Sequence, residues 1–156
     1  MYPKILVPLD GSVEAETTVS LIQEELSRDG TIILLQIIPP AKGLKVGEHT
    51  IVATQREEAN RATSLAYLRS VAEKQSIQPK KWHFEVAVSD SVAEEIANVA
   101  LRERADLVAM FARDRRGIIT RLLPGSLSEK VKDKVPIEVR TFSPDELRGT
   151  GPHTGG

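Results

Sequence analysis

The chain has 156 residues, a formal net charge of -1, 40% hydrophobic residues, 28% charged residues and no cysteine. This length and composition predict a single globular domain with its own core. The near-zero charge gives no reason to expect nucleic-acid or membrane partners, and the absence of cysteine excludes disulfides, thiol catalysis and cysteine-bound metals.

The N-terminal segment predicts a buried strand at Ile5–Val7 and then a helix capped by Ser12. The apolar face of that helix is Ala15, Val19, Ile22 and Leu26, and Asp29-Gly30 is expected to end the helix. No charged region followed by a long apolar region marks a signal peptide, so we expect a cytoplasmic protein.

The middle of the chain predicts two strands around a long helix. Thr31–Ile38 is an apolar strand broken by Gln36, too short to span a membrane. Trp82–Val88 alternates and is less buried. Between them a helix runs from about residue 52 to residue 75. Its expected buried positions are Ala59, Ala62, Leu65, Ala66, Leu68 and Ala72.

The C-terminal part predicts two helices and two further strands. Ser91–Glu94 and Ser126–Glu129 have the pattern of capping boxes. Leu107–Phe111 and Pro136–Phe142 are the fourth and fifth strands. The expected inward residues of the two helices are Val92, Ile96, Val99 and Ala100 in the first, and Leu127 and Val131 in the second.

Alternation of apolar strands and helices is typical of an α/β fold, a doubly wound five-stranded parallel sheet with helices on both faces. We expect one domain over residues 1–142 and a flexible C-terminal tail at 143–156, since the segment RGTGPHTGG offers almost nothing to bury.

Ligands of such sheets bind beyond the carboxyl ends of the strands, where the strand order reverses. Two segments end there with suitable residues. Asp10 follows the first strand and could accept hydrogen bonds from a base or a ribose. Gly125 and Ser126 follow the fourth strand and offer N–H groups and a hydroxyl at a helix N-terminus, which favours anions.

The segments KILVPLDGS, IILLQIIPP, DLVAM, RLLPGSLSEKV and VPIEVRTF, in this order, resemble a single-domain universal stress protein of the UspA-like kind. The resemblance covers residues 2–142. It implies an adenine-nucleotide alpha-hydrolase-like fold with strand order 3-2-1-4-5, a role in stress response, and commonly a homodimer through the last strand.

ATP-binding members of that family resemble G-x2-G-x9-G-[ST] after the fourth strand. Gly125 and Ser126 match its end, but the first two glycines are replaced in either alignment. Counting back from Gly125 places Ala112 and Arg115 there, and aligning on the strand places Phe111 and Asp114 there. Glycine lets backbone N–H groups approach a phosphate, so a side chain narrows the cradle.

Two interpretations of this loop stay open. Either the pocket is closed to ATP, or Arg115 and the neighbouring arginines replace the glycines by binding phosphate through guanidinium groups. Structural explanations also exist for several candidates: Ser126 as a helix cap, Asp10 as a turn residue, and the arginines as a solvated loop. The resemblance implies that Ile37 lines an adenine pocket; the alternative is that Ile37 belongs only to the core.

Neither a metal site nor an enzyme is predicted. His49, His83 and His153 lie far apart and show no ligand spacing. No nucleophile, base and orienting group can be named. We therefore expect a regulatory binding module without strong ATP binding and without a required cofactor; the alternative is an ATP-binding, slowly hydrolysing protein.

The last strand is the expected dimer interface, because an unpaired sheet edge invites pairing. Its interface residues would be Ile137, Glu138, Val139 and Arg140, and antiparallel pairing with a second copy could place Glu138 opposite Arg140. An unidentified protein partner would be a further ligand of such a module.

Overall fold

Five parallel strands form one sheet in the order β3-β2-β1-β4-β5, so the predicted fold class and strand order are confirmed. The structure is a computed structural model and describes residues 1–41, 51–75, 81–111 and 126–143, without the side chains of residues 51–53. The strands are β1 (Tyr2–Leu9), β2 (Leu26–Ile38), β3 (Lys81–Val88), β4 (Leu107–Phe111) and β5 (Glu138–Phe142).

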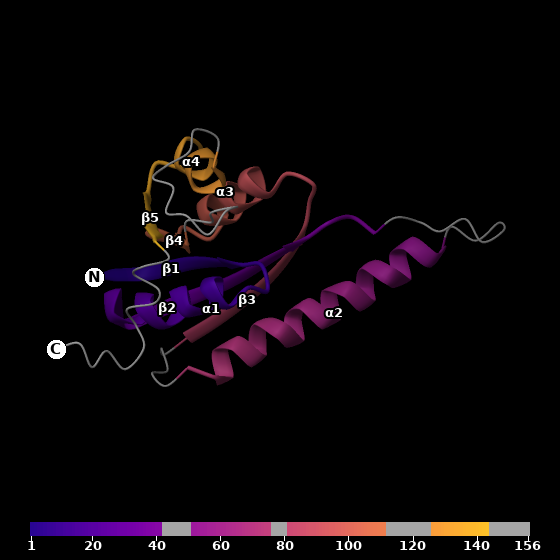
Figure 1. The fold of residues 1–156 in the computed structure, drawn as a ribbon, viewed down its shortest axis with the longest axis horizontal. Helices are drawn as coiled ribbons and strands as arrows, with labels where there is room; N and C mark the ends of the chain where they lie inside the picture. The colour runs from indigo at the N-terminus through magenta and orange to yellow at the C-terminus, as the bar shows by residue number, and fades with distance from the viewer. Residues whose placement is uncertain (42–50, 76–80, 112–125, 144–156) are drawn as a thin grey trace.

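Helices cover both faces of this sheet. The helices are α1 (Val13–Ile22), the 3-10 turn η1 (Gln23–Glu25), α2 (Ile51–Glu73), α3 (Val92–Arg102) and α4 (Leu127–Lys132). Figure 1 shows α1 and α2 below the sheet and α3 and α4 above it. None of the helices in the described ranges has an apolar stretch long enough to cross a membrane.

The alternation of side chains along β1 divides the core in two. Ile5 and Val7 face α1 and α2, while Leu6 faces α3 and α4. All three are fully buried, and Ile5 pairs with Ile32 on one side and with Leu107 on the other. Burial of each such side chain contributes about 1.5–3 kcal/mol, so β1 anchors both layers.

The predicted end of the first helix is wrong. The helix ends at Ile22, a 3-10 turn follows, and β2 already begins at Leu26. Gly30 therefore lies inside a strand. A Cβ at Gly30 would come within 2.5 Å of Leu26 Cδ1, so this glycine permits a close contact rather than ending a helix.

The long helix α2 is buried over only part of its length. Leu68 and Ala72 are buried as predicted, but Ala59, Ala62 and Ala66 are exposed, which corrects the prediction for these three alanines. Figure 1 shows that the first turns of α2 extend beyond the sheet. Ala66 lies further along the helix, between the buried residues Ser64 and Leu68, so it is exposed because it faces away from the sheet.

The start of α3 differs from the predicted capping box. The Ser91 side chain makes no capping bond. The Ser91 N–H, which the Glu94 side chain would accept in a capping box, donates to the Ser89 hydroxyl at 3.0 Å instead. Val92 and Leu127 are 40% and 41% exposed rather than buried. The inward positions of α3 at Ile96, Val99 and Ala100, and of α4 at Val131, are confirmed.

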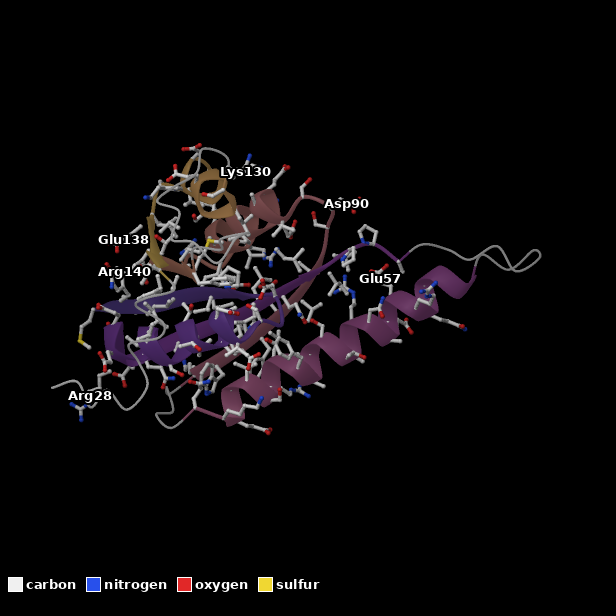
Figure 2. All side chains as sticks on the ribbon, in the orientation of Figure 1. Arg28, Glu57, Asp90, Lys130, Glu138 and Arg140 are labelled. Atoms are coloured by element: carbon white, nitrogen blue, oxygen red, sulfur yellow. The ribbon has the colours of Figure 1, made fainter. Side chains whose placement is uncertain are left out.

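The border strand β5 begins at Glu138, two residues later than predicted, and carries a polar network. Tyr2 donates to Glu138 Oε1 at 2.6 Å, and Arg140 donates to Glu138 Oε2 at 2.9 Å and to the Tyr2 hydroxyl at 3.2 Å. Arg140 also lies 3.0 Å from Glu25. Figure 2 shows Glu138 and Arg140 one above the other on β5.

Candidate functional site

The first candidate site lies at the carboxyl ends of β1, β2 and β4. The strand order reverses between β1 and β4, and this is where open α/β sheets bind ligands. Asp10, Ile37 and Ser126 belong to the described part of this edge. Arg115 and Gly125 lie outside the described residues, so their predicted roles stay predictions.

A tight turn follows β1. Asp10 Oδ1 accepts from the Ser12 N–H at 2.9 Å and from the Ser12 hydroxyl at 2.5 Å, and Gly11 has a φ of +87°. No atom lies within 4 Å of a Cβ built at Gly11, so the backbone angle alone explains this glycine. The turn role expected for Asp10 is therefore observed.

The same turn starts α1. Ser12 Oγ accepts from the Ala15 N–H at 3.2 Å, which confirms the predicted N-cap. Ser12 thus uses its N–H and its hydroxyl proton on Asp10 and its oxygen on the helix. These groups are already engaged before any ligand is present.

A tyrosine that the sequence did not single out faces this turn from α2. The hydroxyl of Tyr67 donates to Glu16 Oε2 at 3.0 Å. Burial, the hydrogen bond to Glu16 and the charges of Glu16 and Asp10 raise the pKa of Tyr67 well above its usual range, and a backbone hydrogen bond from Gly11 lowers it slightly. Tyr67 therefore stays a neutral donor beside two carboxylates.

The end of β2 is held by further contacts from α2. The buried Ser64 hydroxyl donates to Gln36 Oε1, and Arg61 Nη1 donates to the Val86 carbonyl of β3 at 3.2 Å. Ile37 is half-buried, pairs with Ala87 and packs against the α3–α4 side of the core. Ile37 therefore contributes to the core, and its role beside a nucleotide stays a prediction.

The helix cap at Ser126 is also formed. Ser126 Oγ accepts from the Glu129 N–H at 3.2 Å and lies 3.3 Å from Ser128 Oγ. One half of the predicted capping box is thus present at the start of α4. At the ends of β1 and α1 the described groups are carboxylates and a neutral phenol, which suit ligand hydroxyl or amino groups better than phosphate oxygens.

The opposite edge of the sheet holds a second group of polar residues. A cavity of about 540 Å³ lies at the amino-terminal ends of β1 and β3, and its lining includes Lys4, Lys81, His83 and Glu103. His83 is close to two carboxylates here, those of Glu85 and Glu103. The sequence analysis missed this group because it compared the histidines only with one another.

The sheet order, the helices on both faces and the carboxyl-end edge define an α/β protein with the adenine-nucleotide alpha-hydrolase-like fold. The sequence model of the universal stress protein family matches residues 1–140. The chain therefore belongs to the universal stress protein family. No curated protein sequence matches the chain significantly.

Solved structures agree with this fold. Universal stress protein UspA from Lactobacillus plantarum is 19% identical, with a TM-score of 0.66, and the match covers 90% of this chain and 97% of that one. The universal stress protein from Archaeoglobus fulgidus in complex with dAMP is 17% identical, with a TM-score of 0.55 and the same coverage. A family protein from Arabidopsis thaliana with AMP bound is 13% identical, with a TM-score of 0.54 and 90% of each chain covered.

Proposed function

We propose that this protein is a cytoplasmic regulatory binding module of the stress response that acts as a homodimer and does not bind ATP strongly. Membership of the universal stress protein family supports the stress-response role. The observation that carries the ATP argument is the turn at Asp10 and Ser12. Its polar groups are bonded to one another and to α1.

Electrostatics at the end of β1 support the same conclusion. Asp10 is exposed, and Glu16 lies nearby with its carboxylate on Tyr67. Carboxylates repel phosphate oxygens, and the sequence places side chains where a triphosphate cradle would have glycines. A triphosphate would therefore be repelled by the carboxylates and would also find its cradle narrowed by side chains. A neutral ligand group at the end of β1 would not meet this repulsion.

The test is calorimetric titration of Mg-ATP into full-length protein from which bound nucleotide has been removed. The proposal expects no saturable heat in the micromolar range and no thermal shift. Saturable micromolar binding would contradict it and would indicate that the loop arginines, among them Arg115, replace the glycines as phosphate ligands.

The second candidate function is binding of an adenine nucleotide, favoured by the relatives solved with dAMP and AMP. Its contacts would be Asp10, Ile37, Gly125 and Ser126, with arginine side chains at the phosphate. A monophosphate needs less of the altered loop than ATP does. Titration with AMP tests this function separately, and Gly125→Val and Ser126→Ala should each lower AMP affinity while the fold survives.

The dimer would form through β5, which is a border strand of the described sheet. Val139 is 6% exposed and belongs to the core, so pairing would rest on the main chain and on Ile137, with Glu138 and Arg140 already bonded to each other. Light scattering at tens of micromolar protein should give twice the chain mass; a monomer there would remove the dimer from the proposal.

A further inference from the structure

The side chains of His83 and Glu85 lie on the same face of β3, because alternate residues of a strand point the same way. Glu103, at the C-terminal end of α3, reaches the same place from the opposite direction along the sheet. His83 Nε2 lies 3.8 Å from Glu85 Oε2 and 3.7 Å from Glu103 Oε1. One ligand atom from each of the three residues lies within 4.8 Å of the others.

These distances are close to those of a zinc site. Zn–N and Zn–O bonds of about 2.0–2.2 Å place the ligand atoms of a tetrahedral site roughly 3.3–3.5 Å apart. The distances from His83 Nε2 to Glu85 Oε2 and to Glu103 Oε1 exceed this ligand–ligand spacing by only a few tenths of an ångström. The Glu103 side chain is 28% exposed, so it can close the remaining gap without moving the core.

The end of α3 holds the main chain of Glu103 in place. The Arg104 N–H bonds to the Leu101 carbonyl at 3.3 Å and the Ala105 N–H to the Ala100 carbonyl at 2.9 Å, the two bonds of a Schellman motif. Lys4 Nζ also donates to the Glu103 carbonyl at 2.9 Å. The last carbonyls of a helix carry partial negative charge, which favours a cation nearby.

One ligand atom of the cluster has no donor of its own. Arg102 binds Glu85 through Oε1 and lies 3.8 Å from Glu103 Oε1. Glu85 Oε2 is inaccessible to solvent and accepts no hydrogen bond in the structure, although a buried carboxylate oxygen normally has a donor. This oxygen lies 3.8 Å from His83 Nε2. A bound cation would satisfy it, and Arg102 would orient the carboxylate from the other side.

We propose that His83, Glu85 and Glu103 form a binding site for Zn²⁺. The mixed imidazole and carboxylate set suits Zn²⁺, whereas Mg²⁺ and Ca²⁺ prefer oxygen ligands alone. Three protein ligands leave a fourth position for water. That position adjoins the cavity of about 540 Å³, which His83 and Glu103 also line. The proposed zinc site lies at the amino-terminal ends of the strands, whereas the first candidate site lies at their carboxyl-terminal ends.

The experiment is titration of Zn²⁺ into metal-stripped full-length protein against a chromophoric chelator. The proposal expects one site per chain with micromolar or tighter affinity. His83→Ala and Glu103→Gln should each weaken it at least about 10-fold. His49→Ala is the matched control, since it removes a histidine outside the cluster and should leave the affinity unchanged.

A second readout uses Co²⁺ in place of Zn²⁺. A four-coordinate site gives strong visible absorption, which His83→Ala and Glu103→Gln should both abolish. Glu103→Gln keeps the shape of the side chain, so it carries the test even where His83→Ala fails to fold, as judged by circular dichroism. No stoichiometric Zn²⁺ binding, or binding lost in His49→Ala and kept in both cluster variants, would overturn the proposal.

Discussion

The two edges of the sheet use their polar side chains differently. At the carboxyl-terminal edge, Asp10, Ser12 and Ser126 are bonded within their own turns and helix caps. At the amino-terminal edge, His83 and Glu85 converge with Glu103, and a buried carboxylate oxygen has no donor. The usual location of a ligand site in a fold therefore does not show which polar groups can still bind a ligand. That depends on whether the groups are already hydrogen-bonded within the protein.

The largest effect is expected from Leu6→Ala, because both edges depend on the central strand β1. Leu6 is fully buried between α3, α4 and the sheet. Its truncation should lower the free energy of unfolding by about 2–5 kcal/mol, measured by urea denaturation. Val13→Ala is the control, since Val13 is 74% exposed and should change it by less than about 0.5 kcal/mol. A loss below about 1 kcal/mol for Leu6→Ala would contradict the assigned core.

Ser12→Ala separates the two edges, because it alters only the carboxyl-terminal one. It removes the acceptor of the Ala15 N–H and one donor to Asp10, so the free energy of unfolding should fall by about 1 kcal/mol. Thermal unfolding measures this loss. Zinc affinity should stay at the wild-type value; a drop would show that the edges are coupled through the sheet.

Arg104→Gly probes the end of α3 beside the amino-terminal edge. Arg104 has a φ of +55°, a left-handed angle that costs about 1–2 kcal/mol for most residues and little for glycine. Glycine has more conformational entropy in the unfolded chain, which offsets part of this gain. The free energy of unfolding of the variant should therefore rise by about 0.5–1 kcal/mol. Arg69→Gly in the exposed face of α2 is the matched control and should be less stable by about 1 kcal/mol. If both variants lost the same free energy of unfolding, Arg104 would not be strained in the wild-type protein.

The smallest effect concerns the exposed network on β5. The hydrogen bond from Tyr2, and then Arg140, lowers the pKa of Glu138, so its contribution to stability is present above its unfolded pKa of about 4.3 and is lost as the pH falls through the folded value. The bond to Glu138 raises the pKa of Tyr2, whose contribution is present below its unfolded value of about 10 and is lost as the pH rises through the folded one.

Tyr2→Phe should therefore flatten the loss of stability at both pH extremes, measured as urea midpoints across the pH range. Because the network is exposed, the change should be small and should shrink further in high salt. An unchanged pH profile would mean that Tyr2 and Glu138 do not interact in solution.

The sequence predicted the sheet well because apolar runs such as Ile32–Leu35 are long, continuous and buried on both faces. It failed where tertiary context decides. Ala59, Ala62 and Ala66 have the spacing of a buried stripe, but α2 buries Ser64, Leu68, Val71 and Ala72 instead, and a helical pattern of small residues does not show which face meets the sheet. Likewise, Gly30 has the sequence context of a helix end but is packed against Leu26 inside β2.

The candidate sites divide in the same way. The turn at Asp10 and the caps at Ser12 and Ser126 are local, so their residue types and spacing predicted them. His83 and Glu85 are two apart on a predicted strand, and that signal was readable. Glu103 joins them only because α3 returns along the sheet, which no local pattern shows.

The most direct test of the functional account is calorimetric titration of Mg-ATP into nucleotide-free full-length protein. The account predicts no saturable heat in the micromolar range, because the described groups at the carboxyl-terminal edge are already bonded and the loop lacks the glycines of a phosphate cradle. Saturable micromolar binding of ATP, lowered by Gly125→Val, would contradict it.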